Sequence, residues 1–220
     1  MMTVLSGNSE VVVYKAIFPL VWILPPFLAI LGFLVVWKWA KLSGTSIAVL
    51  GDAGVGKTQL YYTLQGKVYD DPKQTSRDDI PEFDYECNGK TYKIKNGVDW
   101  GGNEVQRSVW EDLVKGKDII VFIFDVNKYL TVPEYEKETN SIMEEVWKLL
   151  EKNEKENKHI CIGSHFDELK SYENEKDKAK VDVLNKLKNT PYSELVKRNF
   201  DLIDVRDKKQ VEGIFKKVLE

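Results

Sequence analysis

The sequence predicts an α/β fold, with a doubly wound, mostly parallel six-stranded sheet, helices on both faces and an N-terminal transmembrane helix in front. Apolar strand-like runs alternate with helical segments along most of the chain, a pattern typical of parallel sheets. A glycine-rich loop separates the first of these strands from its helix, and a long uncharged stretch precedes both. A chain of 220 residues has room for one α/β core and this extra segment, but not for two full domains.

Charge and cysteine content exclude some functions. The formal net charge is -3, divided into +2 for residues 1–45 and -5 for the remainder. Because nucleic-acid binding needs a basic surface, the acidic main part argues against a direct nucleic-acid partner. Cys87 and Cys161 fall in predicted strands without the spacing of a zinc site, so we expect reduced core thiols.

The uncharged stretch predicts a membrane anchor. It runs over the 22 residues 16–37, and at about 1.5 Å per residue a helix of this length spans about 33 Å, close to a hydrocarbon core of about 30 Å. We therefore expect a short tail over 1–15, a transmembrane anchor over 16–40 that contacts the lipid bilayer, a linker over 41–45, and the main folded domain over 46–220. No small-x-small site follows the stretch, which favours a retained anchor over a cleaved signal peptide.

The flanking charges predict the orientation of this anchor. Lys38 and Lys41 follow it and only Lys15 precedes it, so the positive-inside rule places the C-terminal domain in the cytoplasm. Pro25-Pro26 must kink or break the helix, which leaves a re-entrant hairpin with both ends in the cytoplasm as an alternative. The five linker residues reach at most about 18 Å, so either arrangement holds the domain near the bilayer.

The glycine-rich loop, Gly51 to Thr58, fits the phosphate-binding pattern G-x-x-x-x-G-K-[ST] between a predicted strand over 46–50 and a predicted helix over 59–65. Its glycines allow backbone N–H groups to cradle an anion at a helix N-terminus. Lys57 is expected to reach the β- and γ-phosphates, and the Thr58 hydroxyl to hold Mg²⁺. The candidate nucleotide-binding residues of this segment are Gly51, Asp52, Ala53, Gly54, Val55, Gly56, Lys57, Thr58 and Gln59.

The remaining elements follow in alternation. The polar residues 70–79 predict a loop, and the Asn88-Gly89 pair predicts a tight hairpin between strands over 82–87 and 91–98, which would be the one antiparallel pair. Beyond these, we expect helices over 105–114, 133–157, 176–188 and 208–219, and strands over 119–124, 159–163 and 200–205.

Two later loops favour guanine as the base. Asp99-x-x-Gly102 follows the third predicted strand and stands before a helix. Ser164-His165-Phe166-Asp167 follows the fifth strand, and a carboxylate there can accept hydrogen bonds from guanine N1–H and the exocyclic amine together. Ser164 supplies a small polar group, and the ring of His165 is flat enough to lie over the base. Asp167 is alternatively a turn or helix-capping residue.

With these motifs in this order, residues 46–220 resemble the small P-loop GTPases of the Ras/Arf superfamily. The N-terminal anchor, Gln74-Thr75-Ser76 and the run from Ile119 to Asp125 are similar to the β subunit of the signal recognition particle receptor. That resemblance implies a GTP-bound form that holds the peripheral receptor α subunit at the endoplasmic reticulum membrane, in co-translational protein targeting. A bacterial membrane-anchored Ras-like GTPase of another pathway, in the inner membrane, fits nearly as well.

The resemblance also implies cofactors and residue roles. GTP or GDP would bind with Mg²⁺, supported through water by Asp99, while the Gly102 N–H meets the γ-phosphate. Thr75, or otherwise Ser76, is the candidate that closes over Mg²⁺ and the γ-phosphate, with a plain turn residue as the alternative. The loop Asp204-Val205-Arg206-Asp207 occupies the place of the S-A-K element without matching it, and no particular base-contacting residue is predicted there.

Departures from the family pattern predict slow hydrolysis. Asn103 stands where the family places a glutamine or histidine that orients the attacking water; it is the candidate catalytic residue and is one methylene shorter than glutamine. Ala53 adds a methyl group that would crowd an incoming arginine finger. Arg77 is either such a finger in cis or a solvated loop residue. The competing enzyme hypothesis is a P-loop ATPase with Asp125 as its Walker B aspartate.

Overall fold

The computed structural model describes residues 44–69, 77–101, 109–152, 158–172 and 175–219, which belong to one compact unit. The expected anchor, the switch candidates Thr75 and Ser76, and the pair Gly102 and Asn103 lie outside the described residues. Within the ranges described, no helix is long and apolar enough to cross a membrane.

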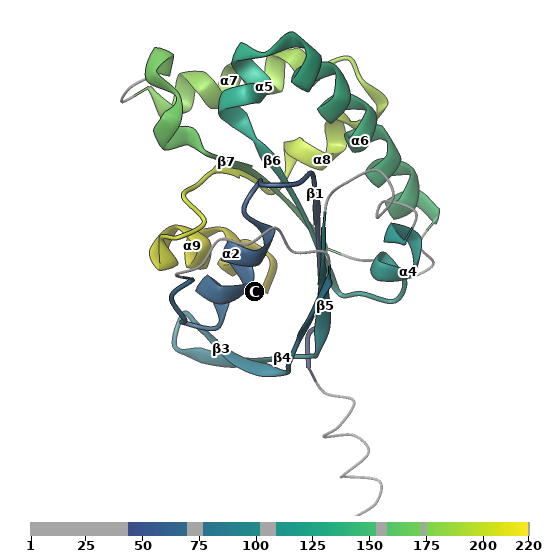
Figure 1. Ribbon diagram of the computed structural model, residues 1–220, viewed down its shortest axis with the longest axis vertical. Helices are drawn as coiled ribbons and strands as arrows, with labels where there is room; N and C mark the ends of the chain where they lie inside the picture. The colour runs from purple at the N-terminus through teal and green to yellow at the C-terminus, as the bar shows by residue number, and fades with distance from the viewer. Residues whose placement is uncertain (1–43, 70–76, 102–108, 153–157, 173–174, 220) are drawn as a thin grey trace, which may run out of the picture. The chain divides into compact units, whose positions relative to one another are not determined.

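Strands and helices alternate along the described chain (Figure 1). The strands are β1 (Ile47–Gly51), β2 (Arg77–Ile80), β3 (Phe83–Cys87), β4 (Lys90–Ile94), β5 (Gly97–Trp100), β6 (Ile119–Asp125), β7 (Lys158–Ser164) and β8 (Phe200–Leu202). The α-helices are α2 (Lys57–Leu64), α4 (Trp110–Val114), α5 (Val126–Thr131), α6 (Pro133–Lys152), α7 (Lys176–Leu187), α8 (Glu194–Lys197) and α9 (Lys208–Leu219). Short 3₁₀ turns cover Phe166–Glu168, Lys170–Tyr172 and Pro191–Ser193.

The centre of the fold is a parallel sheet in the order β1-β6-β7-β8. Every residue of β1 and β6 is buried, which explains why both strands, apart from Asp125 at the end of β6, are apolar rather than alternating with polar residues. The predicted α/β fold is therefore confirmed.

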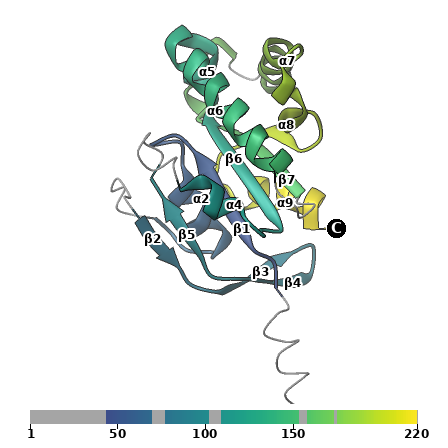
Figure 2. The same ribbon diagram turned by 90° about the vertical axis from the view of Figure 1, so that its right-hand side faces the viewer.

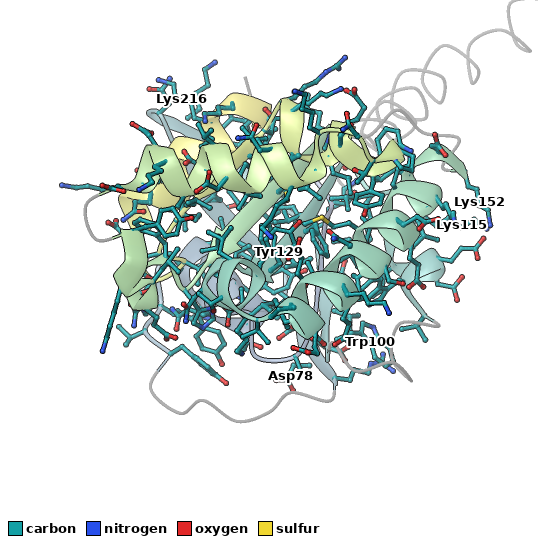
Figure 3. All side chains as sticks on the ribbon, turned by 90° about the horizontal axis from the view of Figure 1, so that it is seen from above. Asp78, Trp100, Lys115, Tyr129, Lys152 and Lys216 are labelled. Atoms are coloured by element: carbon teal, nitrogen blue, oxygen red, sulfur yellow. The ribbon has the colours of Figure 1, made fainter. Side chains whose placement is uncertain are left out.

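Helices cover both faces of this sheet (Figures 1 and 2). Val121 and Ile123 of β6 pack on the side of α2, α9 and the β3–β4 hairpin. Phe122 and Phe124, one position away, pack on the side of α4 to α8, because successive strand side chains point to opposite faces. Figure 3 shows Tyr129 in the interior of this second layer, whereas lysines such as Lys152 extend from the periphery. Cys87 and Cys161 are not joined in a disulfide and are buried in the core, as predicted.

The antiparallel part of the fold differs from its prediction. The Asn88-Gly89 hairpin is confirmed, with φ of 53° and 71° at its two turn residues. The predicted single strand over 91–98 is divided into β4 and β5, and β5 pairs with β2. In place of the predicted six-stranded sheet, the described residues form one sheet of four parallel strands and two antiparallel pairs. A bridge between Thr45 and Ile94 links β4 to the residues just before β1.

Three boundaries also required correction, and one helix was not predicted. The predicted loop over 70–79 is wrong from Arg77 onward, because Arg77 begins β2 and pairs with Trp100. Asp99 lies inside β5 rather than after the strand. The last strand ends at Leu202, not at residue 205. Helix α5 was not predicted, and it begins directly after Asp125, whose side chain caps it.

Candidate functional site

A cavity of about 590 Å³ lies beyond the C-terminal ends of the parallel strands. Segments far apart in the sequence line it: the glycine-rich loop and the start of α2, Trp100 and Gly101 after β5, and the loops after β7 and β8. The predicted site residues that line it are Ala53, Gly54, Gly56, Lys57, Thr58, Gln59, Ser164, His165 and Asp167. Its volume is that of a typical ligand site.

The glycine-rich loop owes its shape to two glycines. Gly51 has a φ of 147°, and a Cβ there would lie 2.2 Å from the Ile123 carbonyl oxygen of the neighbouring strand, so no other residue fits. Gly56, with a φ of 97°, is the residue before α2, and a Cβ there would lie 2.9 Å from Val205 Cγ2. The loop is therefore held tightly between β6 and the loop that follows β8.

Lys57 is the cation at the centre of this loop. Its Nζ donates hydrogen bonds to the backbone oxygens of Gly51, at 3.1 Å, and Asp52, at 2.7 Å, and the residue is 7% exposed. Burial lowers the pKa of Lys57, while the charges of Asp99 and Asp52 oppose that shift. A buried ammonium group held by two carbonyl oxygens at the cavity wall is well placed to attract a phosphate.

Thr58 and Asp99 form an oxygen-rich corner next to Lys57. Thr58 Oγ1 donates a 2.5 Å hydrogen bond to Asp99 Oδ2, and Asp99 is fully buried. Burial raises the pKa of Asp99, opposed by the Thr58 hydrogen bond and by the charge of Lys57.

The other carboxylate oxygen of Asp99 tests whether this corner suits a metal. Asp99 Oδ1 is buried and has no hydrogen-bond partner among the described residues, which is costly unless a further ligand arrives. A hydroxyl and a carboxylate are ligands that Mg²⁺ accepts, with phosphate oxygens and water completing its shell. Thr58 and Asp99 supply only two such ligands, and the described ranges contain no cluster of three His, Cys, Asp or Glu that could hold a metal by themselves.

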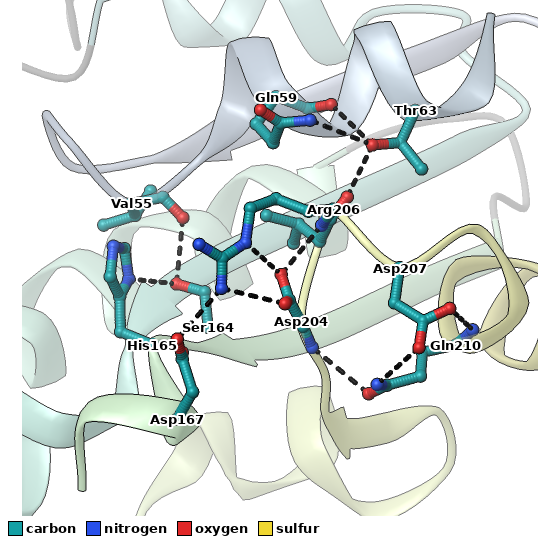
Figure 4. Close-up of polar contacts among 11 residues, drawn as sticks. Val55, Gln59, Thr63, Ser164, His165, Asp167, Asp204, Arg206, Asp207 and Gln210 are labelled. Atoms are coloured by element: carbon teal, nitrogen blue, oxygen red, sulfur yellow. Dashed lines mark hydrogen bonds and ion pairs between the residues drawn. The ribbon is translucent and has the colours of Figure 1, made fainter. Parts of the chain in front are cut away.

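Ser164 connects the opposite end of the cavity to the glycine-rich loop (Figure 4). Its hydroxyl lies 2.9 Å from the Val55 carbonyl oxygen, 3.1 Å from that of Phe124 and 3.0 Å from His165 Nδ1. His165 has a left-handed backbone, with a φ of 57°, and its ring lies at the cavity wall.

Asp167 belongs to the 3₁₀ turn after His165 and lines the same cavity. Its Oδ2 accepts a 2.9 Å hydrogen bond from Arg206 Nη2. Sequence analysis named the loop Asp204-Val205-Arg206-Asp207 but predicted no base-contacting residue in it, because the pair that Arg206 forms with Asp167 joins residues 39 positions apart. Tyr69 and Trp100 were also missed as lining residues.

Asp125 lies in a different environment from Asp99. Its Oδ1 accepts from the Lys128 backbone N–H at 2.9 Å, and its Oδ2 lies 3.1 Å from Lys128 Nζ. It caps α5 and is not among the cavity-lining residues, so its place argues against a Walker B role. The carboxylate that contacts Thr58 is Asp99 instead.

The strand–glycine loop–helix unit, the carboxylate at Thr58 and the shared cavity at the strand ends define a P-loop nucleotide-binding protein. The chain belongs to the ADP-ribosylation factor (Arf) family, whose model matches residues 34–204. It is therefore a small GTPase of the Ras/Arf superfamily, a class of GTP-binding switch proteins that generally bind GTP or GDP with Mg²⁺. A comparison with curated proteins finds no match.

Proposed function

We propose that this GTPase is a membrane-anchored docking switch that holds a cytoplasmic partner when GTP is bound, as the β subunit of the signal recognition particle receptor does. In this proposal Gly51 to Gln59 bind the phosphates, Thr58 and Asp99 support Mg²⁺, and Ser164, His165 and Asp167 bind guanine. The roles of Thr75, Gly102 and Asn103 remain proposals from the sequence.

The observation that carries the nucleotide assignment is one cavity shared by Lys57, Thr58 and Asp167, which come from two different strand ends. Lys57 and the backbone of the loop attract phosphate, and the 53% exposed Asp167 side chain offers its carboxylate at the other end. A purine nucleotide has this polarity, with anionic phosphates at one end and hydrogen-bonding edges at the other.

Replacing Asp167 with asparagine tests the base assignment. The amide can donate where the carboxylate only accepts, so D167N should shift preference from GTP toward XTP. Competition of GTP, XTP and ATP against a fluorescent nucleotide measures the change. Tight ATP binding by the unaltered chain would overturn the guanine assignment.

The anchored docking role is supported by the uncharged residues 16–37 and by the lysines that follow them. We expect the full-length chain to stay with membranes during alkaline carbonate extraction, with its C-terminal domain accessible from the cytoplasmic side. Release into the soluble fraction would refute the anchor. The target membrane is the endoplasmic reticulum in a eukaryote and the inner membrane in a bacterium.

Slow hydrolysis is the second part of the proposal, supported by the short side chain of Asn103. A single-turnover GTP assay, with and without the receptor α subunit as candidate partner, separates a docking switch from an active hydrolase. Partner binding that requires GTP supports docking. Fast hydrolysis by the chain alone argues against it, and GTP-dependent binding to a different partner supports the alternative of a Ras-like GTPase in another pathway.

A further inference from the structure

The loop after β8 places Asp204 and Arg206 next to Asp167 of the turn after β7, at the base end of the cavity (Figure 4). Arg206 Nε donates to Asp204 Oδ1 at 2.8 Å, and its Nη2 donates to Asp204 Oδ2 and Asp167 Oδ2, each at 2.9 Å. The Arg206 backbone N–H also donates to Asp204 Oδ1 at 2.9 Å. The guanidinium is thus fixed by one carboxylate and presented to the other.

This loop is anchored to the rest of the site. Thr63 Oγ1 of α2 donates a 2.6 Å hydrogen bond to the Val205 carbonyl oxygen, and Ile203 N–H donates to the Gly163 carbonyl oxygen at 3.0 Å. Asp204 N–H donates to Gln210 Oε1 at 3.2 Å. The backbone of the loop that carries Arg206 is therefore hydrogen-bonded to α2, at the phosphate end, and to β7. These contacts fix the loop in addition to the exposed ion pairs of Arg206.

The donors of Arg206 are only partly used. A guanidinium has five N–H groups, and the three contacts to Asp204 and Asp167 occupy Nε and both hydrogens of Nη2. For Nη1 the described residues supply no hydrogen-bond partner. Figure 4 shows Nη1 extending toward the side of the site that Val55 and His165 form. The wall therefore offers a free donor next to the acceptor Asp167.

This donor–acceptor pair matches one edge of guanine. Guanine presents N1–H and an exocyclic amine, which Asp167 can accept, and next to them the acceptor O6, with N7 beyond it. Arginine donating to O6 and N7 is a recurrent mode of guanine recognition in nucleic-acid complexes. Adenine places an amino group where guanine has O6, and this donor would meet the donor of Arg206.

We propose that Arg206 is a specificity-determining residue that reads the O6 side of guanine through Nη1, while Asp204 fixes its guanidinium and Asp167 reads N1–H and the amine. The inference rests on the proposed base site and adds to it a residue that supplies a side-chain donor.

Two GDP analogues separate the proposed roles of Arg206 and Asp167 in guanine recognition. 6-Thioguanosine diphosphate weakens the acceptor at position 6 and keeps both donors, whereas inosine diphosphate keeps O6 and lacks the exocyclic amine. We expect the full-length chain to bind both analogues more weakly than GDP. R206M should weaken GDP binding by about tenfold or more, the range for a hydrogen bond to a charged group, and should change 6-thio-GDP binding much less. It should keep its preference for GDP over IDP, whereas D167N should lose that preference.

Two further variants control for charge and folding. R206K keeps the positive charge near Asp204 and Asp167 but lacks Nη1, so it should also lose discrimination at position 6. R198M removes an exposed arginine that does not line the cavity and should bind every nucleotide as the unaltered chain does.

Competition against fluorescent GDP measures all affinities, and each outcome has a distinct meaning. Unchanged discrimination against 6-thio-GDP in R206M and R206K, with the GDP-over-IDP preference present, overturns the role of Arg206 and leaves the guanine site intact. Tighter GDP binding by R206M also overturns it, because Arg206 would then compete with the base for Asp167. No preference for GDP over IDP or ATP in the unaltered chain would refute the proposed function itself.

Discussion

Replacing Ser164 with alanine tests whether the base end and the phosphate end of the cavity are mechanically joined. The Ser164 side chain is 1% exposed, and its hydroxyl lies within hydrogen-bond distance of the carbonyl oxygens of Val55 and Phe124 and of His165 Nδ1. One of these carbonyl oxygens belongs to the glycine-rich loop. In S164A this loop loses its connection to the end of β7.

The expected loss of stability in S164A follows from the number of hydrogen bonds that the Ser164 hydroxyl can donate. A hydroxyl has one hydrogen, so one carbonyl oxygen loses a donor in S164A, and a buried acceptor without its partner costs about 1–3 kcal/mol. We expect the free energy of unfolding to fall by about 1–2 kcal/mol. If the GDP-bound state of the glycine-rich loop loses a similar amount of stabilising free energy, GDP should dissociate about tenfold faster, since 1.4 kcal/mol corresponds to a factor of ten.

Denaturant unfolding and the release rate of fluorescent GDP measure the two effects. Ser193 provides a matched control, because it is also buried, at 7% exposure, but lies before α8 and away from the cavity. S193A should leave GDP release unchanged. Equal GDP release rates in S164A and S193A would refute the connection between the two ends.

Three other substitutions test separate parts of the fold and site. G51A should destabilise the protein by more than about 3 kcal/mol, because the added Cβ would lie 2.2 Å from a backbone oxygen. G213A, within α9, has open space around its Cβ and should stabilise the protein by about 0.5–1 kcal/mol. Thermal unfolding distinguishes the two variants. T58A should remove most of the Mg²⁺ dependence of GDP affinity and T58S should retain it, in a Mg²⁺ titration; equal Mg²⁺ dependence in both would contradict the metal corner. Burial holds the pKa of His159 below its usual value near 6.5, so as pH falls from 7 to 5 the unfolded chain takes up a proton that the folded chain does not, and stability should fall by up to about 1.4 kcal/mol per pH unit. H159Q should flatten this slope, and an unchanged slope would assign the dependence to other groups.

Much of the phosphate end was predictable because its determinants are local. All residues of the phosphate-binding pattern lie in the contiguous segment Gly51 to Thr58. The strand before this segment is recognisable as an apolar run, and a helix follows it directly. The strand β2 was not predictable in this way, since its sequence Arg-Asp-Asp-Ile lacks alternation and three of its four residues are exposed. Pairing with β5 makes it a strand, so tertiary context overrides local preference there.

The base end was predictable only in part. Asp167 follows a recognisable strand, but its relation to Arg206 depends on the parallel register of β7 and β8, in which Gly163 pairs with Leu202. That register brings the two following loops to the same edge of the sheet, and no short pattern encodes it. The start of helix α5 could have been predicted from the sequence, since aspartate is a favourable N-cap residue and Asp125 directly precedes Val126.

The two ends also differ in how far they are prepared for a nucleotide. Lys57 Nζ uses two of its three donors on loop carbonyl oxygens, and Thr58 Oγ1 donates to Asp99. A metal at Thr58 must therefore replace an existing hydrogen bond, and a phosphate can use one further donor of Lys57. At the other end Asp204 already holds the Arg206 guanidinium next to Asp167, and in the proposed site the two Asp204–Arg206 hydrogen bonds stay in place when a base binds. Preorganised groups contribute more of their interaction energy to binding than groups that must rearrange. We therefore expect base selectivity to be nearly independent of Mg²⁺, while affinity for the phosphates depends on it strongly.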